Sequence, residues 1–303
     1  MLPFTATQTL RSALSQLRRQ FEHKGLPPED ARREVLYLAE AALDLSPLNL
    51  LTRQDAPLAE FHHHNRLLVW IKNRLKGQPL SRLKNQRAFW KHTFKVTPHT
   101  LDPRPETEHI IEAVLEHFAN PNLPLRILDL GTGTGCILLS LLHEYPKATG
   151  LGCDLCPQAL AVARQNGSDL NVIHRAHFML SHWFDALDRK QHPPFDVIVS
   201  NPPYIPTTTI PTLDPSVKNF DPILALDGGE DGLNAYRTLI PQAPSFLTPS
   251  GLLALEMGTD QGEALTSMAQ PFFQNIVMKS DLSGHNRVLL CYGPHTHTTN
   301  GQA

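Results

Sequence analysis

Residues 200–206, SNPPYIP, place a carboxamide, two prolines and an aromatic ring side by side. The apolar run FDVIVS before them has the composition of a buried strand. Asn201 would therefore stand at the carboxyl end of that strand, where open α/β sheets bind ligands. Its side-chain oxygen and the Pro202 backbone carbonyl could each accept one hydrogen of a planar NH2 group. The prolines donate no hydrogen bond and stiffen the turn, so both acceptors would be held in place.

Such a pair of acceptors suits group transfer to an amide or aniline-like nitrogen. This nitrogen is a poor nucleophile because its lone pair is delocalised. Rigid acceptors favour its pyramidal form and stabilise the positive charge that develops. Tyr204 could stack on the flat acceptor group, and no general base is needed because the alkylated nitrogen becomes acidic. Asn201, Pro202 and Tyr204 are the candidate catalytic residues; the alternative is a plain proline-rich loop.

A second motif, LDLGTGTGC at 128–136, follows an apolar run and opens a helical pattern. Gly131, Gly133 and Gly135 let the backbone turn tightly and approach a ligand closely. A dinucleotide-binding loop would have its third glycine at position 136, so this spacing fits a loop for S-adenosylmethionine better. Asp154, about 20 residues further on, could accept both ribose hydroxyls of an adenosine. The alternative for Asp154 is an acid at a helix N-terminus.

Other polar residues carry weaker signals. Asp129 could position the glycine loop or bind a ligand's ammonium group. Cys153 and Cys156 form C-x-x-C, but the sequence has no second pair to complete a metal site. The histidines at 62–64 lack a carboxylate or cysteine partner nearby and fit a solvated helix face. We expect no metal site.

Bulk properties bound the remaining options. The chain has 303 residues, 41% of them hydrophobic, a formal net charge of −2 and four cysteines. The sequence shows no signal peptide and no apolar run of the roughly 20 residues that a membrane span needs. We expect a cytoplasmic protein with no membrane partner and no nucleic-acid substrate. Residues 66–95 carry nine Lys and Arg and no acid, which fits a solvated face or a partner-binding surface equally well.

The patterns predict two regions with a connection between them. Apolar residues recur at helical spacing from residue 6 to about 77, so residues 1–84 should form a small all-helical domain. Alternating residues and prolines predict a β-hairpin linker over 85–104. Seven short apolar runs alternating with helical patterns then predict a Rossmann-like α/β domain over 105–293. Its sheet should be mostly parallel with helices on both faces, and 294–303 should form a flexible tail.

Five motifs together resemble one family, the peptide chain release factor N5-glutamine methyltransferases. They are LDPRPETE at 101–108, LDLGTGTGC at 128–136, HWFDAL at 182–187, SNPPYI at 200–205 and ALDGGEDGL at 225–233. The resemblance implies a class I fold and methylation of the glutamine in the Gly-Gly-Gln loop of bacterial release factors. It also implies S-adenosylmethionine as donor and S-adenosylhomocysteine as product. Its helical domain would recognise the substrate.

The family pattern also implies roles for individual residues. The implied cofactor contacts are Gly131, Thr132, Gly133, Thr134, Gly135, Asp154, Trp183 and Asn201. The implied glutamine clamp is Asn201, Pro202, Pro203 and Tyr204. Trp183 could instead belong to the apolar core.

Two departures and two alternatives accompany this resemblance. His182 stands where the family usually has an acid, and SRLKNQRA at 81–88 is more basic than usual. The RPETE stretch has no assigned role, because Arg104 and Glu106 could brace the cofactor or tie the hairpin to the sheet.

An adenine-N6 nucleic-acid methyltransferase would use a similar Asn-Pro-Pro-Tyr turn, and an idle cofactor-binding scaffold is a third reading. We expect a monomer.

Overall fold

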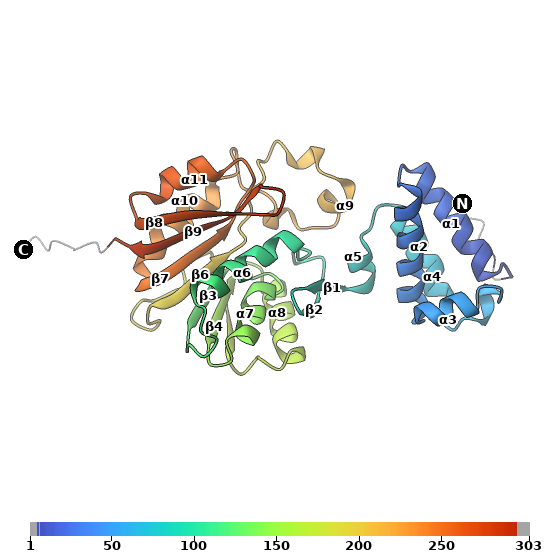
Figure 1. The fold of residues 1–303 in the computed structure, drawn as a ribbon, viewed down its shortest axis with the longest axis horizontal. Helices are drawn as coiled ribbons and strands as arrows, with labels where there is room; N and C mark the ends of the chain where they lie inside the picture. The colour runs from blue at the N-terminus through green and yellow to red at the C-terminus, as the bar shows by residue number, and fades with distance from the viewer. Residues whose placement is uncertain (1–4, 6, 296–303) are drawn as a thin grey trace, which may run out of the picture. The chain divides into compact units, whose positions relative to one another are not determined.

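The computed structural model describes residue 5 and residues 7–295 of the chain, which fall into two compact units. The boundary between the units lies between Lys84 and Asn85. Figure 1 shows helices before this boundary and an α/β arrangement after it. The flexible tail is predicted over 294–303. Residue 294 instead ends the last strand, and residues 296–303 lie outside the described part of the chain.

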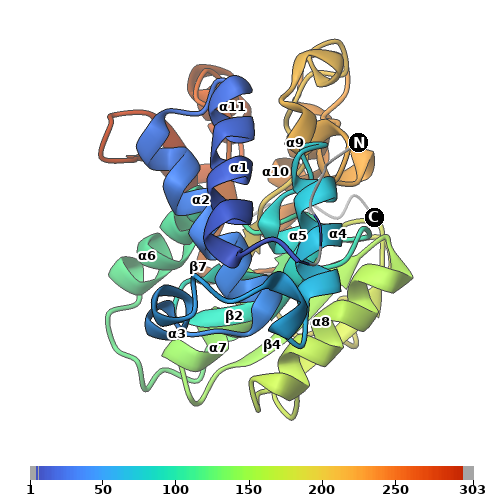
Figure 2. The ribbon, with the colours of Figure 1, turned by 90° about the vertical axis from the view of Figure 1, so that its right-hand side faces the viewer.

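The first unit consists of short helices with a core of their own. They are α1 (Leu10–His23), α2 (Pro28–Leu43), α3 (Pro47–Thr52), α4 (His64–Arg74) and α5 (Leu80–Lys84). The Thr9 side chain caps α1 by accepting from the Ser12 backbone N–H. α1 and α2 lie side by side (Figure 2), and Leu17 and Leu38 are fully buried in the core that the two helices share.

The histidines before α4 require one correction. His63 Nε2 lies 3.2 Å from Asp44 Oδ2, so the expectation that these histidines lack a carboxylate partner is wrong. Asp44 ends α2 in a left-handed conformation and also binds the Arg66 guanidinium. The turn after α2 thereby brings the acid to a histidine about 20 residues away, which the sequence pattern does not reveal.

The second unit begins with the predicted hairpin, β1 (Gln86–Phe89) and β2 (His92–Lys95), which pair antiparallel. Among the described residues, seven further strands form one sheet in the order β5-β4-β3-β6-β7-β9-β8. They are β3 (Arg126–Leu130), β4 (Thr149–Asp154), β5 (Ala176–Leu180), β6 (Phe195–Ser200), β7 (Leu247–Glu256), β8 (Phe273–Ser280) and β9 (Asn286–Pro294). The pairs among β3 to β7 are parallel, and β9 runs antiparallel to β7 and β8. The predicted mostly parallel sheet is confirmed.

Helices cover both faces of this sheet, as predicted (Figure 1). They are α6 (Glu108–His117), α7 (Cys136–Glu144), α8 (Pro157–Asp169), α10 (Asn234–Gln242) and α11 (Gly262–Ala269). The short helix α9 (Pro215–Lys218), in the connection that follows β6, has no buried residue and does not cover the sheet. One buried cluster joins α6 and α7 to the sheet, and a second joins α10 and α11 to it. α6 and α10 are not among the expected helices.

The strand order creates a place for a ligand. The chain passes from β3 outward to β4 and β5, and then crosses to the other side of β3 to form β6 and β7. The loops after β3 and β6 therefore leave in opposite directions, and the crevice between them is where open α/β sheets bind ligands. No helix in the described part of the chain is long and apolar enough to cross a membrane.

Candidate active site

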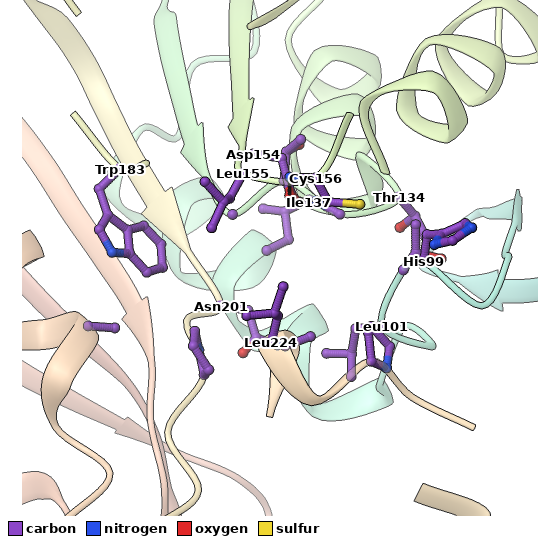
Figure 3. A pocket seen from close by; sticks show the side chains of 18 of the residues that line it. His99, Leu101, Thr134, Ile137, Asp154, Leu155, Cys156, Trp183, Asn201 and Leu224 are labelled. Carbon is purple, nitrogen blue, oxygen red and sulfur yellow. Dashed lines mark hydrogen bonds between the residues drawn. The ribbon is translucent and has the colours of Figure 1, made fainter. Parts of the chain in front are cut away.

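A cavity of about 530 Å³ opens at the carboxyl edge of the parallel strands, a size typical of small-molecule sites. Its walls come from the loops after β3, β4, β5 and β6 and from two segments within 99–107 and 222–238. Figure 3 shows Trp183 at one end, His99 at the opposite end, and Asp154 and Leu155 between them.

The glycine loop bends back onto the end of β4. Its glycines, at 131, 133 and 135, have φ values of +74°, +55° and +79°, a region that glycine enters without strain. The backbone N–H groups of Gly131 and Thr132 each donate to the Cys153 carbonyl at 2.9 Å. A Cβ at Gly131 would lie 3.4 Å from Trp183 Cζ3. The loop thus brings bare backbone to the cavity wall.

Asp129 supports this loop from below. It is fully buried, and its Oδ2 accepts from the Thr132 hydroxyl at 2.7 Å. Burial raises the pKa of Asp129 to about 7, although the bond from Thr132 lowers it. Asp129 does not belong to the cavity lining, so its place fits loop support and not contact with a ligand.

Asp154 stands at the end of β4 and faces the cavity. Its Oδ2 accepts from the Gly133 N–H and its Oδ1 from the Cys156 N–H, both at 2.8 Å. Burial raises its pKa above the ordinary value, and these backbone bonds lower it. A carboxylate has about four acceptor positions, so Asp154 can tie the loop down and still accept from a ligand hydroxyl.

Trp183 and His182 follow β5 at the same edge, and both line the cavity. Trp183 has a φ of +50°, which is uncommon for a bulky side chain and indicates that its surroundings hold it there. His182 Nδ1 lies 3.1 Å from Asp185 Oδ2. The histidine at this position is thus paired with an acid three residues later.

Asn201 leaves the sheet after β6, and its side chain reaches the cavity. Its Nδ2 donates to the Thr107 hydroxyl at 2.9 Å. Because the NH2 end of the carboxamide is held by Thr107, the Oδ1 end is the acceptor left for the cavity. Thr107 belongs to the RPETE stretch, which therefore contacts the SNPPYIP turn through this bond.

Tyr204 points into the protein interior. Its hydroxyl donates to Glu256 Oε1 at 3.3 Å, and burial raises its pKa well above the ordinary value. The Gln261 side chain donates to the carbonyls of Tyr204 and Gly232, both at 3.1 Å. A Cβ at Gly232 would lie 2.3 Å from the Tyr204 carbonyl oxygen. The glycine-rich stretch therefore braces the SNPPYIP turn from behind.

Arg104 ties the RPETE stretch to the segment after α9. Its Nη2 lies 2.5 Å from Asp221 Oδ2, and Asp221 Oδ1 accepts from the Asp102 backbone N–H at 3.3 Å. Pro222 and Leu224, next to this ion pair, line the cavity. The pair thus fastens one cavity wall.

The structure brings most of the candidate site residues to this one cavity. Those in its lining are Gly131, Thr132, Gly133, Thr134, Asp154, Trp183, Asn201 and Pro203. Gly135 precedes α7 and packs against Leu139, Pro202 is buried, and Tyr204 faces Glu256. These three support the cavity from behind and do not line it.

Sequence reasoning missed three residues, Thr107, Glu256 and Gln261. Glu256 carried a usable signal, since it is an acid at the end of an apolar strand, as Asp154 is. Thr107 lay inside a noted motif without an assigned role. Gln261 shows no local pattern, because its partners lie about 30 and 60 residues away in sequence.

The C-x-x-C pair, Cys153 and Cys156, lies at the carboxyl end of β4, at the same edge of the sheet. Cys153 is buried, and burial raises its pKa to about 12, which argues against thiolate chemistry. Cys156 is half-buried and reduced, and its Sγ hydrogen-bonds Gln158. The described residues hold no group of three His, Cys, Asp or Glu side chains arranged for a metal ion.

Comparison with known proteins places this site in a family. Residues 110–211, which include the glycine loop and the SNPPYIP turn, match the model of the "Methyltransferase small domain" family. The fold is also found in the crystal structure of the hMettl16 catalytic domain in complex with the MAT2A 3'UTR hairpin 6. That structure has a TM-score of 0.53 and 15% identity, and the match covers 66% of this chain and 74% of that one.

Two curated relatives are far more similar in sequence. The release factor glutamine methyltransferase of Rhodospirillum rubrum is 42% identical over 270 residues, 86% of this chain and 79% of the relative. The one of Bradyrhizobium diazoefficiens is 40% identical over 291 residues, 95% of each chain. The resemblance inferred from the motifs is confirmed, and this chain belongs to the family of the release factor glutamine methyltransferases.

Proposed function

We propose that this protein transfers a methyl group from S-adenosylmethionine to the side-chain amide nitrogen of a release factor glutamine, leaving S-adenosylhomocysteine. The observation that carries the proposal is the orientation of Asn201, whose Nδ2 is bound by Thr107 and whose Oδ1 is left for an acceptor in the cavity. The names of the relatives support the choice of substrate.

The cavity fits the proposed donor in size and in the chemistry of its walls. S-adenosylmethionine supplies a methyl group on a positively charged sulfur. Asp154 offers acceptors for ribose hydroxyls, and Trp183 and Leu155 offer apolar surface for an adenine. The glycine loop, including Thr132 and Thr134, offers backbone that a ligand can approach without meeting a Cβ.

The proposed acceptor is the glutamine of the Gly-Gly-Gln loop. Asn201 Oδ1 would accept an amide hydrogen of this glutamine, and Pro203 would border it. Pro202 and Tyr204, which do not line the cavity, would hold the turn in place from behind. The acceptor oxygen stabilises positive charge as the nitrogen gains the methyl group, after which the nitrogen loses a proton. Release factors act in translation, so we place the reaction in the cytoplasm. We also propose that the enzyme is a monomer.

The test offers labelled S-adenosylmethionine with release factor, DNA and RNA in separate reactions. We expect label on the release factor, and its loss when the loop glutamine is replaced by alanine. Label on nucleic acid alone would contradict the proposal and favour an adenine substrate. No transfer to any of the three would favour a cofactor-binding scaffold.

A further inference from the structure

Glu256, the last residue of β7, is a buried acid beside the proposed clamp. Only 2% of its surface is exposed. β7 runs parallel to β6 with Leu255 opposite Ser200, so Glu256 and Asn201 leave the sheet on neighbouring strands. None of the roles assigned above uses this carboxyl group. A buried acid is costly unless its partners compensate it, so its position here requires a reason.

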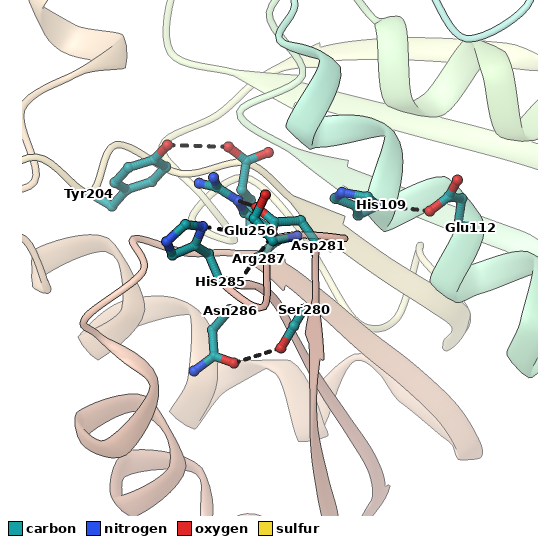
Figure 4. Close-up of polar contacts among 10 residues, drawn as sticks. His109, Glu112, Tyr204, Glu256, Ser280, Asp281, His285, Asn286 and Arg287 are labelled. Atoms are coloured by element: carbon teal, nitrogen blue, oxygen red, sulfur yellow. Dashed lines mark hydrogen bonds and ion pairs between the residues drawn. The ribbon is translucent and has the colours of Figure 1, made fainter.

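Polar side chains from separate elements surround the Glu256 carboxyl group, whose Oε2 is buried and accepts no hydrogen bond from the described residues. The Tyr204 hydroxyl, on the turn after β6, donates to Oε1 at 3.3 Å (Figure 4). The side chains of Thr107 and Asn201 are close enough to the carboxyl group to lower its pKa. Thr107 in turn accepts from Asn201 Nδ2 at 2.9 Å. Asn201 and Thr107 thus belong to one group of polar side chains beside Glu256, and the Thr107 hydroxyl keeps its hydrogen for an acceptor.

Glu256 can change its charge near neutral pH. Burial raises its pKa to about 7, against the lowering effect of its hydrogen bonds, and the negative charge of Glu106 raises it further. The other ionisable groups near it are Tyr236 of α10, Cys136 of α7 and, beside Tyr204, Arg287 of β9. Burial raises the pKa of Cys136 to about 12 and that of Tyr236 well above its usual value. Neither of these two groups titrates near pH 7.

We propose that Glu256 is a positioning residue for methyl transfer, whose carboxylate orients the Thr107 hydroxyl and, through it, the Asn201 carboxamide. This inference rests on the proposed function of the same site. Once Glu256 has released its proton to solvent it can only accept, so the Thr107 hydroxyl donates to it and keeps its lone pairs for Asn201 Nδ2. Asn201 Oδ1 is then fixed towards the acceptor nitrogen.

The protonated state has the opposite effect. A neutral Glu256 is itself a donor and competes with Asn201 Nδ2 for the Thr107 oxygen. The carboxamide then loses its fixed orientation, and the acceptor for the glutamine amide is misplaced. The rate of methyl transfer should therefore rise with pH as Glu256 ionises, whereas binding of the cofactor should not.

The experiment compares wild type with Glu256→Gln and with Glu263→Gln, the same change at an exposed position of α11. It measures kcat and KM for release factor between about pH 6 and pH 8.5, at saturating S-adenosylmethionine, in the window around the pKa of Glu256. Calorimetry with S-adenosylhomocysteine checks that the cofactor site is intact.

We expect kcat of wild type and of Glu263→Gln to rise with pH, with an apparent pKa of about 7. Glu256→Gln should lack this rise. At the upper end of the pH range its kcat should be roughly 10- to 100-fold below that of wild type, as for a misplaced reacting group. KM and the affinity for S-adenosylhomocysteine should change little. A Glu256→Gln enzyme with the wild-type kcat and pH profile would overturn the inference and would attribute the titration to another group, such as Asp129.

If Glu256→Gln does not fold, a second pair of variants tests the same inference. Thr107→Val removes the hydroxyl, and Thr107→Ser retains it. We expect Thr107→Val to lose kcat as Glu256→Gln does, and Thr107→Ser to retain most of it. Equal kcat for Thr107→Val and wild type would contradict the inference. If wild type itself transfers no methyl group to release factor, the proposed function fails, and this result is distinct from the variant results.

Discussion

The chemistry of the site depends on the orientation of one carboxamide. Asn201 could present either its NH2 or its oxygen to the cavity, and these ends have opposite hydrogen-bonding roles. The bond from Nδ2 to Thr107 decides between them. A donor facing an amide nitrogen would repel the hydrogens that the reaction must hold, whereas an acceptor binds them. The RPETE stretch therefore contributes to the site through Thr107.

Replacing Asn201 by alanine tests this role. Asn201→Ala should lower kcat for release factor methylation by at least about 100-fold, as for loss of one preorganised polar group. Affinity for S-adenosylhomocysteine should stay largely intact, because the glycine loop and Asp154 remain. Asn122→Ala, at an exposed loop position, serves as the control. An unchanged rate in Asn201→Ala would remove this residue from the mechanism.

The residues that sequence could predict are those marked by a local pattern. Asp154 and Asn201 each end an apolar run, and the glycines recur at fixed spacing, so their places follow from the strands alone. Thr107 and Gln261 could not be predicted in this way, because their roles depend on partners far away in sequence. Tyr204 was correctly placed on the turn, but the direction of its hydroxyl depends on the distant Glu256.

At the scale of elements, the ends of neighbouring parallel strands gather the site. β3, β4, β6 and β7 end at the same edge, and each delivers a polar residue there. Alternating strand and helix patterns predict this arrangement. The helices α6 and α10 escaped prediction, and α10 contains Pro241 in its last turn, which disrupts the usual helical signal.

The glycine-rich stretch before α10 permits a test of backbone packing. Gly232 and Gly284 both have positive φ, of +77° and +81°, but a Cβ at Gly284 would meet nothing within 4 Å. The Cβ of Gly232→Ala would collide with the Tyr204 carbonyl, and the SNPPYIP turn would have to move. We expect Gly232→Ala to lose about 100-fold in kcat, the cost of a displacement of about 1 Å. Gly284→Ala, with the same backbone strain, should keep its activity; equal losses would mean that strain alone is responsible.

At the scale of the whole molecule, two buried acids link stability to pH. Burial raises the pKa of Asp129 from 3.8 and that of Glu256 from 4.5, both to about 7. Between these values the folded chain binds more protons than the unfolded chain, so stability falls as pH rises. His92 and His117, whose pKa values burial lowers, act in the opposite direction.

Comparison of variants isolates the contribution of one acid. The free energy of unfolding, measured with urea from about pH 5 to pH 8, should fall less steeply for Asp129→Asn than for wild type. The difference in slope should be at most about 1.4 kcal/mol per pH unit, the limit for one proton. Identical slopes would show that Asp129 is ionised throughout this range in the folded protein.

The central claim is that the cavity and the SNPPYIP turn together methylate one glutamine of a release factor. Mass spectrometry of release factor, after incubation with this protein and S-adenosylmethionine, tests it most directly. The account predicts the mass of one added methyl group on the glutamine of the Gly-Gly-Gln loop and none elsewhere. A methyl group on another residue would contradict it. So would a loop glutamine that stays unmodified although the enzyme binds S-adenosylhomocysteine.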